Sequence, residues 1–146
     1  MRLSISINDG EVKRKLAKLA EDIGDFKTPL RRSGIYMERK TDQRFRSGGL
    51  GKWEKLKPST IRRRRKGSSS ILQDTGRLKQ SVTSSPDIYH LTKTYLRIGT
   101  TVKYAKYHQN GTRHMPARPF LLIDEEDERK IKEIFSRWVE ELVAKL

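Results

Sequence analysis

The sequence predicts an α+β fold in which a small antiparallel sheet packs against long helices, including an amphipathic helix at the C-terminal end. Three observations lead to this prediction. Apolar residues recur at helical spacing over residues 124–146, two earlier segments show the same spacing, and two short strand-like segments lie close together near residue 90. With 146 residues the chain has the length of one domain, so we predict a single domain over residues 1–146.

A strand and a helix are expected first. In residues 3–7 leucine and isoleucine alternate with serine, which is the period of a strand with one buried face. Asn8 or Asp9 is a suitable N-cap for the helix that follows. Its apolar residues keep helical spacing as far as Ile23, and Gly24 ends it.

A second helix is expected from Pro29 to about Phe45. Thr28 would be its N-cap, because proline at the first helical position loses no hydrogen bond. Gly34 falls on the apolar face, where another element can approach closely. Three glycines within residues 47–51 end this helix.

The middle of the chain is predicted to be irregular. Trp53 is expected to pack a short turn against the core, and one or two helical turns follow residues 59–60. Residues 62–66 are four arginines and a lysine, followed by Gly67 and three serines. We predict a mobile, solvated basic loop at about residues 62–70.

Three short elements are expected next. A helix capped by Asp74 or Thr75 would carry Leu78 and Val82. An antiparallel hairpin and another short helix follow, at residues 88–91, 95–98 and 102–109.

The last helix has the clearest signal. Five consecutive acids at residues 124–128 suit the positive end of a helix dipole. An apolar stripe follows, made by Ile131, Ile134, Phe135, Trp138, Leu142 and Leu146. Val139 and Val143 widen this stripe beyond what a lone surface helix needs, so we expect a contact there.

The charge of the chain points to a polyanion or an acidic protein as a partner. The formal net charge is +15. Residues 124–146 hold eight acids and five bases, net −3, which leaves 28 bases and 10 acids, net +18, on residues 1–123. A field of this sign attracts nucleic acid or acidic protein surfaces.

The sequence shows no reaction centre. It has no cysteine, and His90, His108 and His114 lack the spacing of metal ligands, so no metal or cofactor is expected. Neither a nucleophile elbow nor a phosphate-binding glycine loop is present. The acids at residues 124–128, with His108, leave a small metal-dependent nuclease as a third hypothesis, although the helix dipole explains the acids more simply.

Secretion and membrane insertion are not expected. The first residues lack the apolar region of a signal peptide, and no run approaches the roughly 18 apolar residues that a membrane span needs. We therefore expect a protein made and assembled in the cytoplasm, with no membrane partner.

The stretch from Tyr104 to Phe120 is predicted to be an interaction loop held between the sheet and the last helix. The Asn110-Gly111 pair and the prolines mark specific turns beside aromatic, amide and basic side chains. The residues expected at a subunit or partner interface are Tyr104, Tyr107, His108, Asn110, Arg113, Arg118, Phe120, Trp138 and Leu142. Those expected to contact nucleic acid or an acidic partner are Arg62, Arg63, Arg64, Arg65 and Lys66.

Five blocks in this order resemble the phage virion morphogenesis family, the tail completion proteins of Mu-like and other contractile-tailed phages and prophages. The blocks are Trp53 with Leu56 and Thr60, ILQDTGRLKQSV at residues 71–82, IGT at 98–100, YAKYHQNG at 104–111 and PARPFL at 116–121. The resemblance covers roughly residues 53–138. It does not extend to the arginine run, which looks like this chain's own elaboration.

This resemblance implies a structural, non-enzymatic virion protein that completes the tail or the neck between head and tail, assembled in the cytoplasm of a host bacterium. Its implied partners are copies of itself in a ring of six-fold or twelve-fold symmetry, the tail tube or terminator, and neck proteins. Packaged DNA would be a non-specific contact. The alternative is a cytoplasmic nucleic-acid-binding protein that uses its basic loops on phosphates, which salt-dependent DNA binding would distinguish.

Overall fold

The structure is a computed structural model that describes residues 10–146, so the strand predicted at residues 3–7 lies outside the described residues. The elements in order are α1 (Gly10–Ile23), α2 (Lys27–Ser47), α3 (Pro58–Arg63), α4 (Arg77–Gln80), β1 (Ile88–Leu91), β2 (Leu96–Gly99), α5 (Ala105–Asn110) and α6 (Glu125–Ala144). The predicted α+β architecture, with long helices and a small antiparallel sheet, is confirmed.

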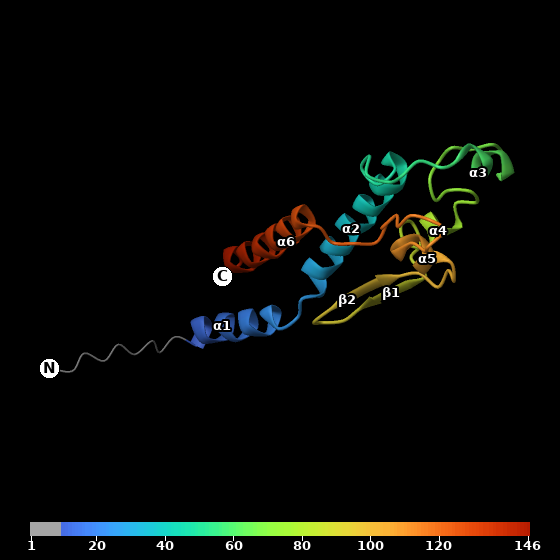
Figure 1. Cartoon of the computed structure of the whole chain (residues 1–146). Helices are drawn as coiled ribbons and strands as arrows, with labels where there is room; N and C mark the ends of the chain where they lie inside the picture. The colour runs from blue at the N-terminus through green and yellow to red at the C-terminus, as the bar shows by residue number, and fades with distance from the viewer. Residues whose placement is uncertain (1–9) are drawn as a thin grey trace.

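The longest helix, α2, is the centre of the molecule (Figure 1). It contacts α6 and both strands, while α1 contacts α6. Gly34 lies where β2 meets α2, and a Cβ atom there would come within 2.6 Å of Leu96 Cδ2. The predicted close approach at Gly34 is therefore confirmed, because only a hydrogen leaves room for the Leu96 side chain.

The two strands form an antiparallel hairpin, as predicted. Ile88 pairs with Gly99 and Leu91 with Leu96. The second strand begins at Leu96, one residue later than predicted, because Tyr95 closes the turn by accepting a hydrogen bond from Thr92 N at 2.9 Å.

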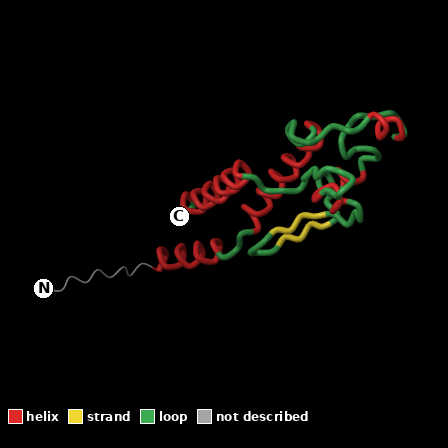
Figure 2. Tube along the Cα trace, in the orientation of Figure 1, coloured by secondary structure: helices red, strands yellow, loops and turns green. Residues whose placement is uncertain are grey.

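The core is small and lies at one end of α2. It consists of Phe45, Trp53, Leu72, Leu78, Val82, Ala105 and Phe120. Much of the chain between α2 and β1 is loop (Figure 2), and single side chains hold it to the core. Trp53 does so as predicted: its ring meets Phe45 edge to face at 5.7 Å, and Nε1 donates to Pro119 O at 3.1 Å.

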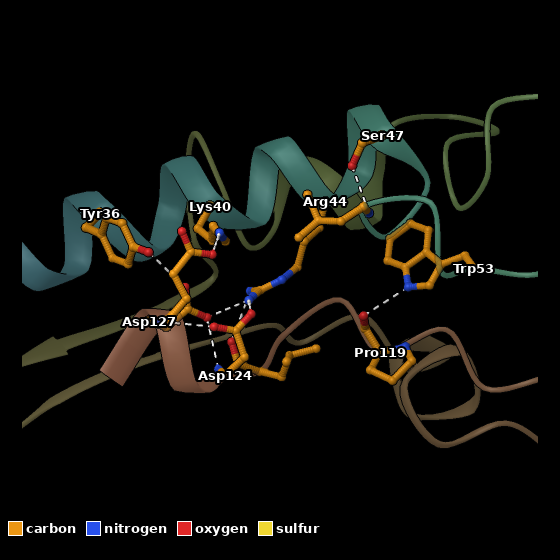
Figure 3. A network of polar contacts seen from close by, with 11 residues as sticks. Tyr36, Lys40, Arg44, Ser47, Trp53, Pro119, Asp124 and Asp127 are labelled. Carbon is orange, nitrogen blue, oxygen red and sulfur yellow. Dashed lines mark hydrogen bonds and ion pairs between the residues drawn. The ribbon is translucent and has the colours of Figure 1, made fainter. Parts of the chain in front are cut away.

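A buried polar network joins α2 to the start of α6 (Figure 3). Asp124 and Asp127 form a capping box in which each side chain accepts from the other's backbone N–H. Arg44 Nη2 donates to Asp127 Oδ2 at 2.5 Å and Nη1 to Leu122 O at 3.0 Å. The predicted helix-start role of these acids is confirmed for Asp124 and Asp127.

Tyr36 completes this network from the next turns of α2. Its hydroxyl donates to Asp127 Oδ1 at 2.9 Å. Burial, and then the hydrogen bond to Asp127, raises the pKa of Tyr36 to about 12. Asp127 therefore receives donors from two turns of α2, which fixes the direction in which α6 leaves the core.

Three predicted helix boundaries are also wrong. The second helix begins at Lys27 and not at Pro29, because Asp25 Oδ1 accepts from Lys27 N at 3.0 Å and starts the helix two residues early. The helix carrying Leu78 ends at Gln80, so Val82 lies beyond it while remaining in the core. The short helix after the hairpin begins at Ala105 instead of Val102.

Nothing in the described part of the chain is both long and apolar enough to be a membrane-spanning helix.

Candidate interaction surface

The predicted turn after α5 requires glycine at Gly111. Its φ is +73° and ψ is 173°, and a Cβ atom would come within 2.7 Å of Ala117 N. Arg118 N donates to His108 O at 2.7 Å, and Thr112 pairs with Met115. Residues 111–118 therefore fold back tightly on α5 and present a defined surface.

Aromatic side chains cover the outer side of α5. Tyr104 and Tyr107 remain 45% and 47% exposed. Lys106 Nζ lies 5.1 Å from the centre of the Tyr107 ring, and the Tyr104 and His108 rings meet edge to face at 5.7 Å. Large exposed aromatic side chains beside positive charges are typical of protein contact surfaces.

Gln109 fixes the next segment to α5. Its side-chain Oε1 accepts from Phe120 N and Leu121 N, at 3.1 and 3.2 Å, and Nε2 donates to Leu121 O at 2.8 Å. A single amide therefore satisfies three backbone groups that no regular element pairs. The sequence prediction missed this role because an isolated glutamine carries no pattern.

Arg118 was expected at the contact surface, but the structure buries it. Nε donates to Glu54 O at 2.9 Å and Nη2 to Lys55 O at 3.4 Å. Its side chain thus joins the segment after Trp53 to the loop after α5. Burial lowers the pKa of Arg118, with Arg64 adding to this effect and Glu54 opposing it.

Three other expected interface residues do not join this surface. Phe120 is buried in the core 5.6 Å from the Phe45 ring, and Trp138 is buried on α6 at 5.6 Å from the Phe26 ring. Leu142 is half-buried beside α1. The expected residues that do lie together on the surface around α5 are Tyr104, Tyr107, His108, Asn110 and Arg113.

The structure brings part of the arginine run next to α5 across a cavity, which we call the basic groove. It has a volume of 610 Å³. Its charged lining is Lys55, Lys57, Arg63, Arg64 and Arg118 against Glu54 and Asp74, and Tyr104, His108 and His114 also line it. With five basic residues against two acids, the groove suits an anionic group such as a phosphate or a carboxylate.

The arginine run is divided between a helix and a loop, unlike the continuous loop predicted. Arg62 and Arg63 form the last turn of α3. Arg64 folds inward and donates to Ser68 O at 3.2 Å and also to Ser70 O. Arg62, Arg63 and Arg65 stay exposed, together with Lys66.

The pKa of His108 is lowered by its environment. Burial lowers its pKa first, and the nearby charges of Arg118 and Arg64 lower it further. Its Nδ1 is buried without a hydrogen-bond partner among the described residues. The His108 imidazole thus lines the basic groove together with Arg64 and Arg118.

The residues considered for a metal-dependent nuclease do not come together within residues 10–146. No three metal-ligating side chains come together in that range. His90 stacks on Tyr95 at 5.6 Å, away from His108 and its groove, and the acids of the hypothetical nuclease site are used in the helix cap or lie on the surface.

Comparison with known proteins agrees with a morphogenesis role. The profile of the phage virion morphogenesis family matches residues 7–140. The chain is 34% identical over 140 residues to Mu-like prophage FluMu G protein 2 of Haemophilus influenzae, covering 90% of this chain and 91% of that protein. It is 44% identical over 48 residues to FluMu G protein 1 of the same organism, covering 33% of each.

No solved structure matches the chain. A family match over most of the chain, and a relative aligned over nearly its whole length, leave one conclusion: this chain belongs to the phage virion morphogenesis family.

Proposed function

We propose that this protein is a structural subunit of the virion that completes the phage tail, or the neck joining tail to head, by binding alone. The observation that carries this proposal is the presence of two different exposed surfaces at opposite ends of an elongated subunit (Figure 1).

One surface is the outer side of α5 with the loop after it, where Tyr104 and Tyr107 are exposed beside the basic groove. The other is the outer side of α6, where Val139 and Val143 remain 41% and 52% exposed. Apolar side chains that the subunit leaves exposed in a row along a helix favour a partner that covers them.

Two different surfaces on one subunit favour head-to-tail contacts, in which one surface binds the other on the next copy. Contacts of this kind close into rings when the rotation between copies divides the circle evenly. A ring of six-fold or twelve-fold symmetry would match the tail end or the neck, with the tail tube or terminator and neck proteins as partners.

The basic groove supports a further contact with packaged DNA or with an acidic ring next to it. Exposed Arg62, Arg65 and Lys66, which do not line the groove, add to the charge around it. The same observation favours the second candidate, a nucleic-acid-binding protein that acts outside the virion. If that candidate is correct, the protein binds DNA, and infectious particles assemble normally without the protein.

The proposal is tested by electron microscopy of tails made without this protein, followed by complementation with variants. Tails made without it should have defective ends or fail to join heads. A Tyr104→Ala, Tyr107→Ala double variant should complement poorly, because exposed tyrosines at an interface each contribute about 2 kcal/mol, or about 30-fold in affinity.

Tyr95→Ala is the matched control, since Tyr95 is equally exposed, at 43%, but lies on the hairpin turn. It should complement like the parent. Normal, infectious particles assembled without the protein would overturn the proposed role.

A further inference from the structure

A second groove, lined almost entirely by apolar side chains, runs along β2 and is separate from the surface around α5. We call it the apolar groove; its volume is 530 Å³. Its lining comes from α2, β2, the segment before α6 and α6 itself. The apolar side chains include Leu30, Met37, Leu96, Ile98, Leu122, Ile131 and Phe135.

One edge of β2 opens into the apolar groove. Thr92 N donates to Tyr95 O, so the pair next to the turn is hydrogen-bonded, and the bonded pairs then alternate along the hairpin. The backbone N–H and C=O groups of Leu96 and Ile98 therefore point away from β1. Only β2 of the two strands lines the groove, which places this unpaired edge beside it.

The sequence contains a segment that matches this edge. Residues 3–7 alternate apolar and serine, with Leu3, Ile5 and Ile7 on one face. Five residues in a strand span about 16 Å, against about 13 Å for the four residues of β2. One face of such a strand would be apolar, like the floor of the groove, and the other would be polar, like the solvent.

The subunit's own segment cannot reach this position. The C-terminal end of α1 lies at the hairpin, where Phe26 N donates to Lys93 O, and its first residue, Gly10, lies at the far end (Figure 1). A helix of 14 residues is about 21 Å long. Ile7 is only three residues from Gly10, a reach of about 10 Å, so it cannot return to lie beside β2.

Two polar side chains that line the apolar groove lack an ion pair or a hydrogen bond among the described residues. Glu38 has no ion pair among the described residues, and burial raises its pKa. The Thr41 hydroxyl is buried without a hydrogen-bond partner in the described part of the chain.

We propose that the apolar groove receives residues 3–7 of a second copy of this chain as a third strand of the sheet. The backbone of that segment pairs with Leu96 and Ile98, and Leu3, Ile5 and Ile7 pack onto α2 and α6. This inference rests on the self-association in the proposed function, and it identifies a contact that links neighbouring copies.

Disulfide cross-linking tests the proposal on the full chain, which has no cysteine of its own. One protein carries Ile98→Cys, in the wall of the apolar groove. It is mixed in turn with proteins that carry Leu3→Cys, Ile5→Cys or Ile7→Cys and is oxidised mildly. At least one of these pairs should form a covalent dimer several-fold more efficiently than Ser4→Cys or Ser6→Cys, which face the other way on the strand.

A second measurement does not depend on cysteine geometry. Ile5→Asp should weaken self-association several-fold, because it places a charge in an apolar groove, whereas Ser6→Asp should leave self-association unchanged. Equal effects of the two changes would overturn the proposal.

The outcomes also separate this inference from the proposed function. A double variant with Ile5→Cys and Ile98→Cys is oxidised at high dilution. If its disulfide forms only within one chain, the binding of residues 3–7 to the groove of a second copy is wrong. Assembly onto tails without any alternating cross-link would overturn the added strand while leaving the proposed function intact. Loss of the proposed function itself would appear instead as normal particles made without the protein.

Discussion

Replacing Arg44 by methionine should destabilise the protein more than any other change to a charged residue of α2. Arg44 is 3% exposed and its partner Asp127 is fully buried. Methionine keeps the alkyl length but removes the donors to Asp127, Asp124 and Leu122. The Asp127 carboxylate would then remain buried with only neutral donors.

Removing one partner of a buried ion pair costs about 3–5 kcal/mol. For a domain of this size, a loss of that much free energy of unfolding lowers the melting temperature by about 10 °C. Urea unfolding followed by circular dichroism measures the free energy, and thermal unfolding measures the shift.

Arg46→Met is the matched control, two residues along the same helix. Arg46 is 72% exposed and pairs with Asp42 across one turn. Exposed pairs of this kind contribute about 0.5 kcal/mol or less. Adding Asp127→Leu to Arg44→Met should restore part of the loss by removing the uncompensated charge. Equal effects of the two arginine variants, or no recovery in the double variant, would refute this role of the network.

Three more sets of changes test the turn at Gly111, the carboxylate of Asp87 and the exposed arginines at residues 62–65. Gly111→Ala should lower the free energy of unfolding by about 1–3 kcal/mol, because alanine is strained at φ +73° and its Cβ atom would meet Ala117 N. Gly67→Ala is the control: Gly67 has φ +58° but no atom within 4 Å, so the loss measured by chemical denaturation should be smaller. Hydrogen bonds from Thr101, and then Arg77, lower the pKa of Asp87 to about 2. The stability that ionised Asp87 contributes is therefore fully present above a pH of about 4 and is lost as the pH falls through about 2. The difference in melting temperature between Asp87→Asn and the parent should shrink to zero over that range, and a constant difference would contradict this. If DNA binds at the basic groove, replacing Arg62, Arg63 and Arg65 by alanine should reduce the slope of the logarithm of the binding constant against that of the salt concentration by about one unit per residue. Replacing the exposed Lys27, Arg31 and Arg39 of α2 should leave this slope unchanged.

Local patterns predicted much of the fold. The acids before α6 and the apolar spacing along it are repeated signals within one element, and both were confirmed. Gly34 was predicted to allow a close approach because a glycine on the apolar face of a helix leaves room there for a neighbouring element. The hairpin was predicted because its two strands are adjacent in the sequence.

The contacts that the sequence did not predict join residues far apart in the chain. Arg44 resembles its solvated neighbours on α2, and nothing nearby indicates a partner at Asp127. Arg118 was predicted to be a contact residue because it is a basic residue of the loop after α5. Its burial was not predicted, because its acceptors are backbone carbonyls of Glu54 and Lys55, which carry no side-chain signal. The basic groove depends in the same way on segments that only the fold brings together.

The central claim is that this chain acts by being covered by copies of itself and by neighbouring virion proteins. The most direct measurement is the mass of the purified protein, alone and mixed with tail tubes, by light scattering after size-exclusion chromatography. The claim predicts a complex of fixed stoichiometry with the tubes, lost in the Tyr104→Ala, Tyr107→Ala variant and kept in Tyr95→Ala. A protein that stays monomeric and elutes apart from the tubes would contradict it.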